Sequence, residues 1–117
     1  MFTLADLPYS FDSFEPSIDT ETMQIHHDKH HATYVKNLND LLVGQDELLN
    51  MDIEELLQNL DQVPEDIRTK VRNNGGGHFN HSLFWSLMAP NSSGEPIGDV
   101  AVAITESFTD FTSFKEK

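Results

Sequence analysis

All histidines of the chain lie in two short windows, and the neutral imidazole ring is the commonest metal ligand among side chains. They are His26, His27, His30, His31, His78 and His81. On a helix, residues four apart share a face, so His26 and His30 pair, with Tyr34 one turn further along. His81 and Trp85 share a face of a second periodic stretch in the same way. If these two helices pack as an antiparallel hairpin, the two windows can meet and form a metal site.

Structural roles must be weighed against this interpretation, because a single histidine in a core is more often a hydrogen-bonded structural residue than a ligand. Six histidines on two facing stripes favour the metal site. His27 and His31 lie about 100° round the helix from His26 and His30, so we expect them at the edge of the stripe or facing solvent. The segment also resembles the zinc-protease motif H-E-x-x-H, but Asp28 replaces its glutamate and no third ligand follows, which argues against a zinc hydrolase.

Four helices are predicted to position these residues. Residues 1–18, with two prolines among aromatic side chains, should form an extended arm that packs on the rest of the chain. Asp19 caps a first helix that runs to about Leu42. The apolar stripe of this helix is Met23, His26/His27, His30, Tyr34, Leu38 and Leu41. A short second helix from Asp52 to Leu60 begins with a capping-box pattern.

A third helix should begin near Pro64, which suits a first turn. Its stripe is Ile67, Val71, Asn74, His78, His81, Trp85 and Met88. Three glycines, 75–77, fall inside it, and each costs about 1 kcal/mol relative to alanine. Because the stripe stays in phase across them, we predict an unbroken helix whose glycines allow close packing against the first helix near Tyr34. After a loop over 90–96, Asp99 should open a fourth helix. Its apolar face is Val100, Ala103, Ile104, Phe108 and Phe111.

Two long stretches of the chain closely resemble the N-terminal half of the iron/manganese superoxide dismutases. They are MQIHHDKHHATYV over 23–35 and RNNGGGHFNHSLFW over 72–85, and the opening Leu7-Pro8-Tyr9 fits the family's N-terminal arm. The resemblance runs over essentially the whole chain. It implies a fold that is all-α here, with a helical-hairpin domain over 1–90. Residues 91–117 would then be a linker and the first helix of an α+β C-terminal domain that is incomplete.

The resemblance also implies roles for individual residues. His26 and His81 correspond to metal ligands, His30 and Tyr34 to the gate for substrate and protons, and Phe84 and Trp85 to the apolar lining. The family's other two ligands lie in a stretch of the form Asp-x-x-x-His, and no histidine follows His81 here. We therefore expect this chain to supply two of four protein ligands and not to dismute superoxide at the family's rate by itself.

Dismutation requires a metal that changes oxidation state, which excludes zinc and suits manganese or iron held by imidazoles and a carboxylate. Iron-type members of the family often carry a glutamine four residues before the second ligand. That position is Gly77 here, which favours manganese as the cofactor. The resemblance further implies superoxide and protons as substrates and a homodimer for the full-length protein.

Composition limits the other possibilities. The 20 acidic and 7 basic residues give a net charge of −13, which opposes binding to nucleic acid or an anionic membrane. The absence of cysteine excludes disulfides and thiolate chemistry. Neither a membrane-spanning run nor a secretory signal is evident, so we expect a cytoplasmic protein. The alternative function is a non-enzymatic helical module that binds metal weakly or pairs with another chain.

Overall fold

The structure, a computed structural model, describes residues 1–92 and 94–117, so Ser93 of the predicted linker lies outside the described residues. Every regular element in this part of the chain is a helix, as predicted. The elements are α1 (Thr20–Gln24), η1 (Ile25–His31), α2 (Ala32–Leu41), α3 (Asp46–Leu49), α4 (Ile53–Gln58), η2 (Leu60–Gln62), α5 (Glu65–Leu87), α6 (Gly98–Phe108) and α7 (Phe111–Lys115). None of the described helices is both long and apolar enough to cross a membrane.

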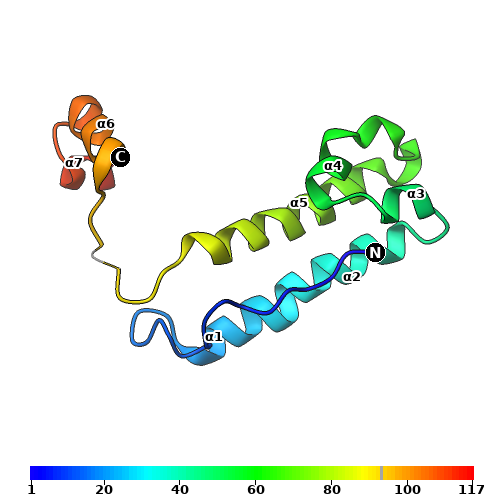
Figure 1. The fold of residues 1–117 in the computed structure, drawn as a ribbon, viewed down its shortest axis with the longest axis horizontal. Helices are drawn as coiled ribbons and strands as arrows, with labels where there is room; N and C mark the ends of the chain where they lie inside the picture. Colours follow the sequence, from blue (N-terminus) through cyan, green and yellow to red (C-terminus); the bar gives the residue numbers. More distant parts are fainter. Residues whose placement is uncertain (93) are drawn as a thin grey trace.

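The predicted antiparallel hairpin is confirmed. Segments α1, η1 and α2 follow one another without a break, and α5 returns alongside them (Figure 1). Asn37 Nδ2 of α2 donates to Asn74 Oδ1 of α5 at 3.3 Å, while His26 of η1 lies against His81 seven residues further along α5. Contacts therefore move backwards on one helix as they move forwards on the other. The short elements α3, α4 and η2 connect the two long arms at one end of the hairpin (Figure 1).

Local capping explains where several helices begin. The Asp19 carboxylate accepts a hydrogen bond from Thr22 N at 2.7 Å, and Asp52 accepts one from Glu55 N at 2.8 Å. Each bond satisfies a backbone N–H that has no partner within its helix, so both predicted caps are confirmed. Pro64 precedes α5 as its N-cap, one residue outside the predicted position. The four-residue helix α3 was not predicted.

The apolar core fills the end of the hairpin near the connecting elements α3, α4 and η2. Its most deeply buried members are Leu38, Leu42, Leu56 and Val71, each with 0% exposure. Fully burying such a side chain stabilises the fold by about 1.5–3 kcal/mol. The N-terminal arm covers one side of this core, where Phe2 is buried. Phe2 N donates to Asn39 Oδ1 at 3.0 Å, and Asn39 Nδ2 donates to Phe2 O at 2.9 Å, so the arm packs on the first long helix as expected.

The buried face of the first long helix differs from the prediction. Its buried residues are Met23, His27, His31, Val35, Leu38 and Leu42, rather than the predicted stripe through His26, His30 and Tyr34. The cause is η1, a π-helical stretch whose hydrogen bonds run from i to i+5. Its turn is wider than the 3.6 residues of an α-helix, so residues four apart stay on one face through several steps. The expectation that His27 and His31 lie at the edge or in solvent is therefore wrong.

The glycine triplet behaves as predicted, since α5 is unbroken over Glu65–Leu87. A Cβ atom on Gly77 would lie 2.5 Å from Tyr34 Cδ1, far inside van der Waals contact. A Cβ atom on Gly75 would lie 3.3 Å from Leu57 Cδ2, whereas one on Gly76 would meet nothing within 4 Å. Gly77 is therefore the glycine that allows the two long helices to approach at Tyr34.

The C-terminal segment forms two helices where one was predicted. Helix α6 begins at Gly98, with Asp99 in its first turn rather than at its N-cap. Thr109 then adopts φ of +76° and ends the helix, and the Asp110 carboxylate accepts from Ser113 N at 2.7 Å to start α7. Phe108 and Phe114 pack edge to face across this turn, with ring centroids 5.2 Å apart. Residues 88–92 and 94–97, between α5 and α6, form neither helix nor strand.

Candidate metal centre

The two histidines predicted to hold a metal come together across the hairpin. The ring centroids of His26, from η1, and His81, from α5, lie 4.9 Å apart with the ring planes at 82°. Both rings are partly exposed. His30 follows on the same side of η1, with its ring centroid 6.3 Å from that of His26. The antiparallel packing thus brings together residues 55 positions apart, as the two periodic stripes predicted.

These rings border an open pocket of about 370 Å³. Its lining residues are His26, Lys29, His30, Thr33, Tyr34 and His81. The Tyr34 ring lies 5.2 Å from that of His81. On the opposite side, the rings of Trp85 and Phe84 lie 4.8 and 5.5 Å from His26. All six residues singled out by the resemblance therefore lie close together, four of them lining the pocket and the two aromatic rings packed against His26.

The hydrogen bond of His81 leaves one ring nitrogen free for a ligand. His81 Nδ1 lies 2.7 Å from the carbonyl oxygen of Gly77. A carbonyl oxygen can only accept, so Nδ1 carries the proton and donates it. The neutral ring then has its lone pair on Nε2. A histidine held in this way by a backbone carbonyl is a common arrangement at metal sites, because the second bond fixes both the tautomer and the ring orientation.

The surroundings of His26 also favour the neutral ring that metal binding requires. Burial lowers the pKa of His26, and the neighbouring rings of His81 and His30 lower it further. A lower pKa keeps the imidazole unprotonated at neutral pH, so a nitrogen lone pair is available. Two neutral imidazoles directed into one pocket fit part of the coordination sphere of manganese or iron.

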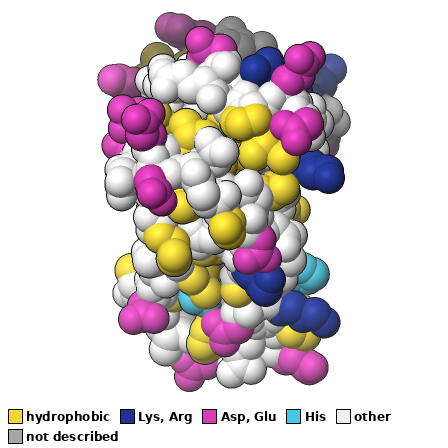
Figure 2. All heavy atoms as spheres, turned by 90° about the vertical axis from the view of Figure 1, so that its right-hand side faces the viewer, with side chains coloured by type: hydrophobic (Ala, Val, Ile, Leu, Met, Phe, Trp, Pro, Cys, Tyr) yellow, Lys and Arg dark blue, Asp and Glu magenta, His cyan; other side chains and the backbone are white. Residues whose placement is uncertain are grey.

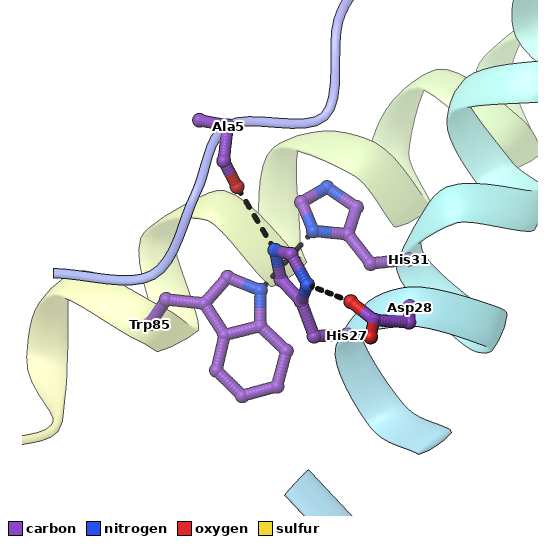
Figure 3. A network of polar contacts seen from close by, with 5 residues as sticks. All are labelled: Ala5, His27, Asp28, His31 and Trp85. Atoms are coloured by element: carbon purple, nitrogen blue, oxygen red, sulfur yellow. Dashed lines mark hydrogen bonds and ion pairs between the residues drawn. The ribbon is translucent and has the colours of Figure 1, made fainter. Parts of the chain in front are cut away.

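The buried histidines form a separate hydrogen-bonded chain. Trp85 Nε1 donates to His31 Nδ1 at 3.1 Å (Figure 3), and His31 Nε2 lies 2.7 Å from His78 Nδ1. The indole nitrogen can only donate, so His31 accepts at Nδ1 and donates from Nε2 to His78. Burial, followed by the neighbouring rings of His78, His81 and His27, lowers the pKa of His31 to about 4. Burial, followed by His81, also lowers the pKa of His78.

His27 ties the N-terminal arm to the same helix. Its Nε2 lies 2.9 Å from the Ala5 carbonyl oxygen, and its Nδ1 lies 2.7 Å from Asp28 Oδ1 (Figure 3). Both partners are oxygen atoms, so each ring nitrogen of His27 has its own hydrogen-bond partner. Tyr9 Oη, also in the arm, donates to the carbonyl oxygen of Trp85 at 2.9 Å. The arm therefore holds both long helices at the end where the pocket lies.

Within the part of the chain that the structure describes, no group of three or more His, Cys, Asp or Glu side chains is placed to hold a metal ion. His26 and His81 are the two imidazoles singled out from the sequence, and their role as ligands stays a prediction. Asp99 and Asp110, the two aspartates of the C-terminal segment, lie at the starts of helices α6 and α7.

Comparison with known proteins identifies the fold. Residues 1–89 match the family described as "Iron/manganese superoxide dismutases, alpha-hairpin domain". The chain belongs to the iron/manganese superoxide dismutase family. The match ends at residue 89, two residues after the last residue of α5.

Curated relatives from several bacteria agree with this membership. "Superoxide dismutase [Mn] 1" of Leptolyngbya boryana is 54% identical over 114 residues, covering 97% of this chain and 46% of the relative. "Superoxide dismutase [Mn]" of Listeria innocua is 53% identical over 116 residues, covering 99% and 57%. "Superoxide dismutase [Mn] 2" of Bacillus cereus is 54% identical over 116 residues, covering 99% and 56%. The chain spans about half the length of the curated relatives it matches.

In this member of the superoxide dismutase family, analysis of the sequence missed the roles of His31 and His78. Two signals could have indicated them. The buried residues from Met23 to Val35 recur at every fourth position, which exceeds the period of an α-helix. In addition, the indole N–H of a buried tryptophan usually finds a partner, and His31 supplies the acceptor for Trp85.

Proposed function

We propose that His26 and His81 are two ligands of a manganese or iron ion, and that the protein to which this chain belongs dismutates superoxide. The observation that carries the proposal is the convergence of the two rings, 4.9 Å apart, on one pocket. The hydrogen bond from His81 Nδ1 to Gly77 O supports it, because it leaves Nε2 available. A bound manganese or iron ion supplies one-electron redox chemistry, which zinc cannot.

The reaction converts two superoxide ions and two protons into dioxygen and hydrogen peroxide. One superoxide loses an electron and the other gains one, so protons must reach the second. Tyr34 and His30 line the pocket beside the proposed ligands. The phenol of Tyr34 and the imidazole of His30 hold and transfer these protons in this proposal, since both groups can donate and accept a hydrogen bond. Trp85, which is 4% exposed, shields the inner side of the site from water.

The charge distribution determines how an anionic substrate would approach. The chain carries a formal net charge of −13, and Asp and Glu side chains are spread over the face shown in Figure 2. Such a field repels superoxide at long range. Lys29 lines the pocket, and its positive charge attracts superoxide at short range. Salt screens the repulsion by distant charges more than this local attraction. Attraction near the pocket must therefore come from Lys29 and from the bound cation.

Manganese is the preferred metal in this proposal. Gly77 stands where iron-type members often carry a glutamine, and the curated relatives described above carry manganese in their names. We also propose a hairpin domain over 1–90 and a second unit that begins with 91–117. A homodimer and a cytoplasmic location remain predictions for the full-length protein.

The test is to assay superoxide removal by the 117-residue chain loaded with Mn²⁺ or Fe²⁺, against the free aqua ion. With two ligands we expect no activity above that of the free ion. We expect activity when a segment supplying an Asp-x-x-x-His stretch completes the site, and we expect His81→Ala to abolish it. Activity of the completed protein that survives loss of His26 or His81 would contradict the proposal. Activity of the chain alone, lost in His81→Ala, would show that a third ligand has been overlooked.

A second candidate is a non-enzymatic helical module. The observation that favours it is that the described residues provide no group of three potential ligands. The two candidates differ in one measurable respect, because a module that only binds another chain should keep that binding in His26→Ala and His81→Ala. The dismutase should lose its bound metal in both variants.

A further inference from the structure

We infer that the buried hydrogen-bonded chain Trp85–His31–His78 sets the register of the hairpin at the metal site and so positions both proposed ligands. This inference rests on the proposed function, because it concerns how His26 and His81 are held for a metal. It assigns His31 as a positioning residue, although His31 does not line the pocket.

Four rings form a closed loop of contacts at the site. His26 meets Trp85 with centroids 4.8 Å apart, and His81 stacks on His31 at 5.2 Å with the planes at 25°. Trp85 and His31 are joined by a hydrogen bond of 3.1 Å, and the two ligand rings face each other at 4.9 Å. Each proposed ligand, His26 or His81, therefore packs against a member of the buried hydrogen-bonded chain Trp85–His31–His78.

The three side chains of the Trp85–His31–His78 chain are buried, and their hydrogen bonds run in one direction. His31, Trp85 and His78 are only 1%, 4% and 7% exposed, so water cannot easily replace a lost partner. The indole of Trp85 can only donate, which makes His31 an acceptor at Nδ1 and a donor at Nε2. The hydrogen-bonded chain Trp85–His31–His78 therefore has one direction and one set of tautomers.

These hydrogen bonds restrict how η1 can slide along α5. His31 belongs to η1, while both of its partners belong to α5, one on either side of His81 in the sequence. Apolar side chains can slide along one another at modest cost, but an unpaired polar group in the interior costs the full desolvation penalty. A shift of η1 along α5 would break both bonds at once. The hydrogen-bonded chain therefore favours the single register in which His26 meets His81.

Two substitutions at one position separate hydrogen bonding from packing. His31→Gln retains an acceptor for Trp85 and a donor for His78, whereas His31→Phe retains a flat ring but neither bond. Val35→Ala is the matched control, since Val35 is buried on the next turn of the same face and forms no polar contact with the site. All three are compared with the unmodified chain by NMR without metal, and then by titration with Co²⁺.

In the metal-free chain we expect ring-to-ring nuclear Overhauser effects between His26 and His81, and a Trp85 indole proton shifted by its hydrogen bond. His31→Phe should lose both signals and weaken Co²⁺ binding about tenfold or more, although both ligands remain. His31→Gln should recover binding to within about threefold of the unmodified chain. Val35→Ala should destabilise the fold and leave the ring contacts and Co²⁺ affinity close to normal.

Retention of the ring contacts and of Co²⁺ affinity in His31→Phe would overturn the inference. Equal losses in Val35→Ala would also overturn it, because they would reflect stability alone. If His31→Phe does not fold, His78→Phe removes the final acceptor and should give the same losses, with intact affinity again the contrary result. If the unmodified chain binds no Co²⁺, the proposed metal site fails, while the NMR comparison still decides the inference about register.

Discussion

The hairpin contains two groups of histidines that alternate along the same helices and have opposite surroundings. His27, His31 and His78 are buried, and each makes a hydrogen bond through the ring. His26, His30 and His81 line an open pocket, where His81 keeps Nε2 free. Satisfied ring nitrogens in a dry interior hold structure, whereas unsatisfied ones facing a pocket can bind ligands. Neighbouring positions in one histidine-rich segment thus serve different purposes.

Removal of one buried ring should have the largest effect on stability. His31→Ala leaves a cavity and deprives the Trp85 indole and His78 of their partner. We expect the free energy of unfolding to fall by about 3–5 kcal/mol, from the cavity and the unpaired polar groups together. Urea denaturation of the metal-free chain measures this. His30→Ala is the control, since His30 is exposed and surface changes usually stay within about 0.5 kcal/mol. Similar losses in both variants would contradict the division into two groups.

The pH dependence of stability should follow the buried group. The pKa of His31 is lowered from 6.5 to about 4 in the folded chain, so the unfolded chain binds more protons between these values. Stability is then fully present above pH 6.5 and falls as the pH drops toward 4. We expect a smaller loss than in His31→Ala, because the ring remains in place. Denaturation midpoints measured with a chelator present check this, and His31→Gln should flatten the curve. An unchanged slope in that variant would assign the effect to other groups.

Gly77 sits at the boundary between the two groups, where it accepts the His81 hydrogen bond and faces Tyr34. Gly77→Leu should lower the free energy of unfolding by about 1–3 kcal/mol, because its Cβ would overlap the Tyr34 ring. Gly76→Leu is the matched control, since nothing lies within 4 Å of its Cβ position. That change should be neutral or stabilising through helix propensity. Thermal unfolding of the two variants decides, and equal stability would show that Tyr34 moves aside without cost.

The hairpin was predictable because it depends on local rules that the sequence displays. The caps at Asp19 and Asp52 need only a carboxylate beside a helix start, and the unbroken α5 follows from a stripe that stays in phase across its glycines. The convergence of His26 and His81 follows from the antiparallel packing of the two helices that carry the histidine windows. The prediction failed where an average period does not apply. The π-helical stretch at Ile25–His31 exchanged the buried face, and Thr109 ended α6 through a positive φ that threonine seldom adopts.

The smallest effect on stability should come from the open group, and it bears most directly on function. His26→Ala removes a half-buried ring that has no hydrogen bond among those that hold the fold, so we expect a loss below about 1 kcal/mol. Metal binding should respond in the opposite way, because one of two ligands disappears while the other alone holds a divalent ion weakly. A Co²⁺ titration should show a loss of affinity of at least about tenfold in His26→Ala, with a normal urea midpoint.

His27→Gln is the contrasting variant, since it changes the adjacent buried histidine and should disturb the arm at Ala5 while leaving Co²⁺ affinity within a few-fold. If His26→Ala destabilised the chain as strongly as His31→Ala and left Co²⁺ binding intact, His26 would belong with the structural histidines, and the metal centre proposed for this pocket would lose its first ligand.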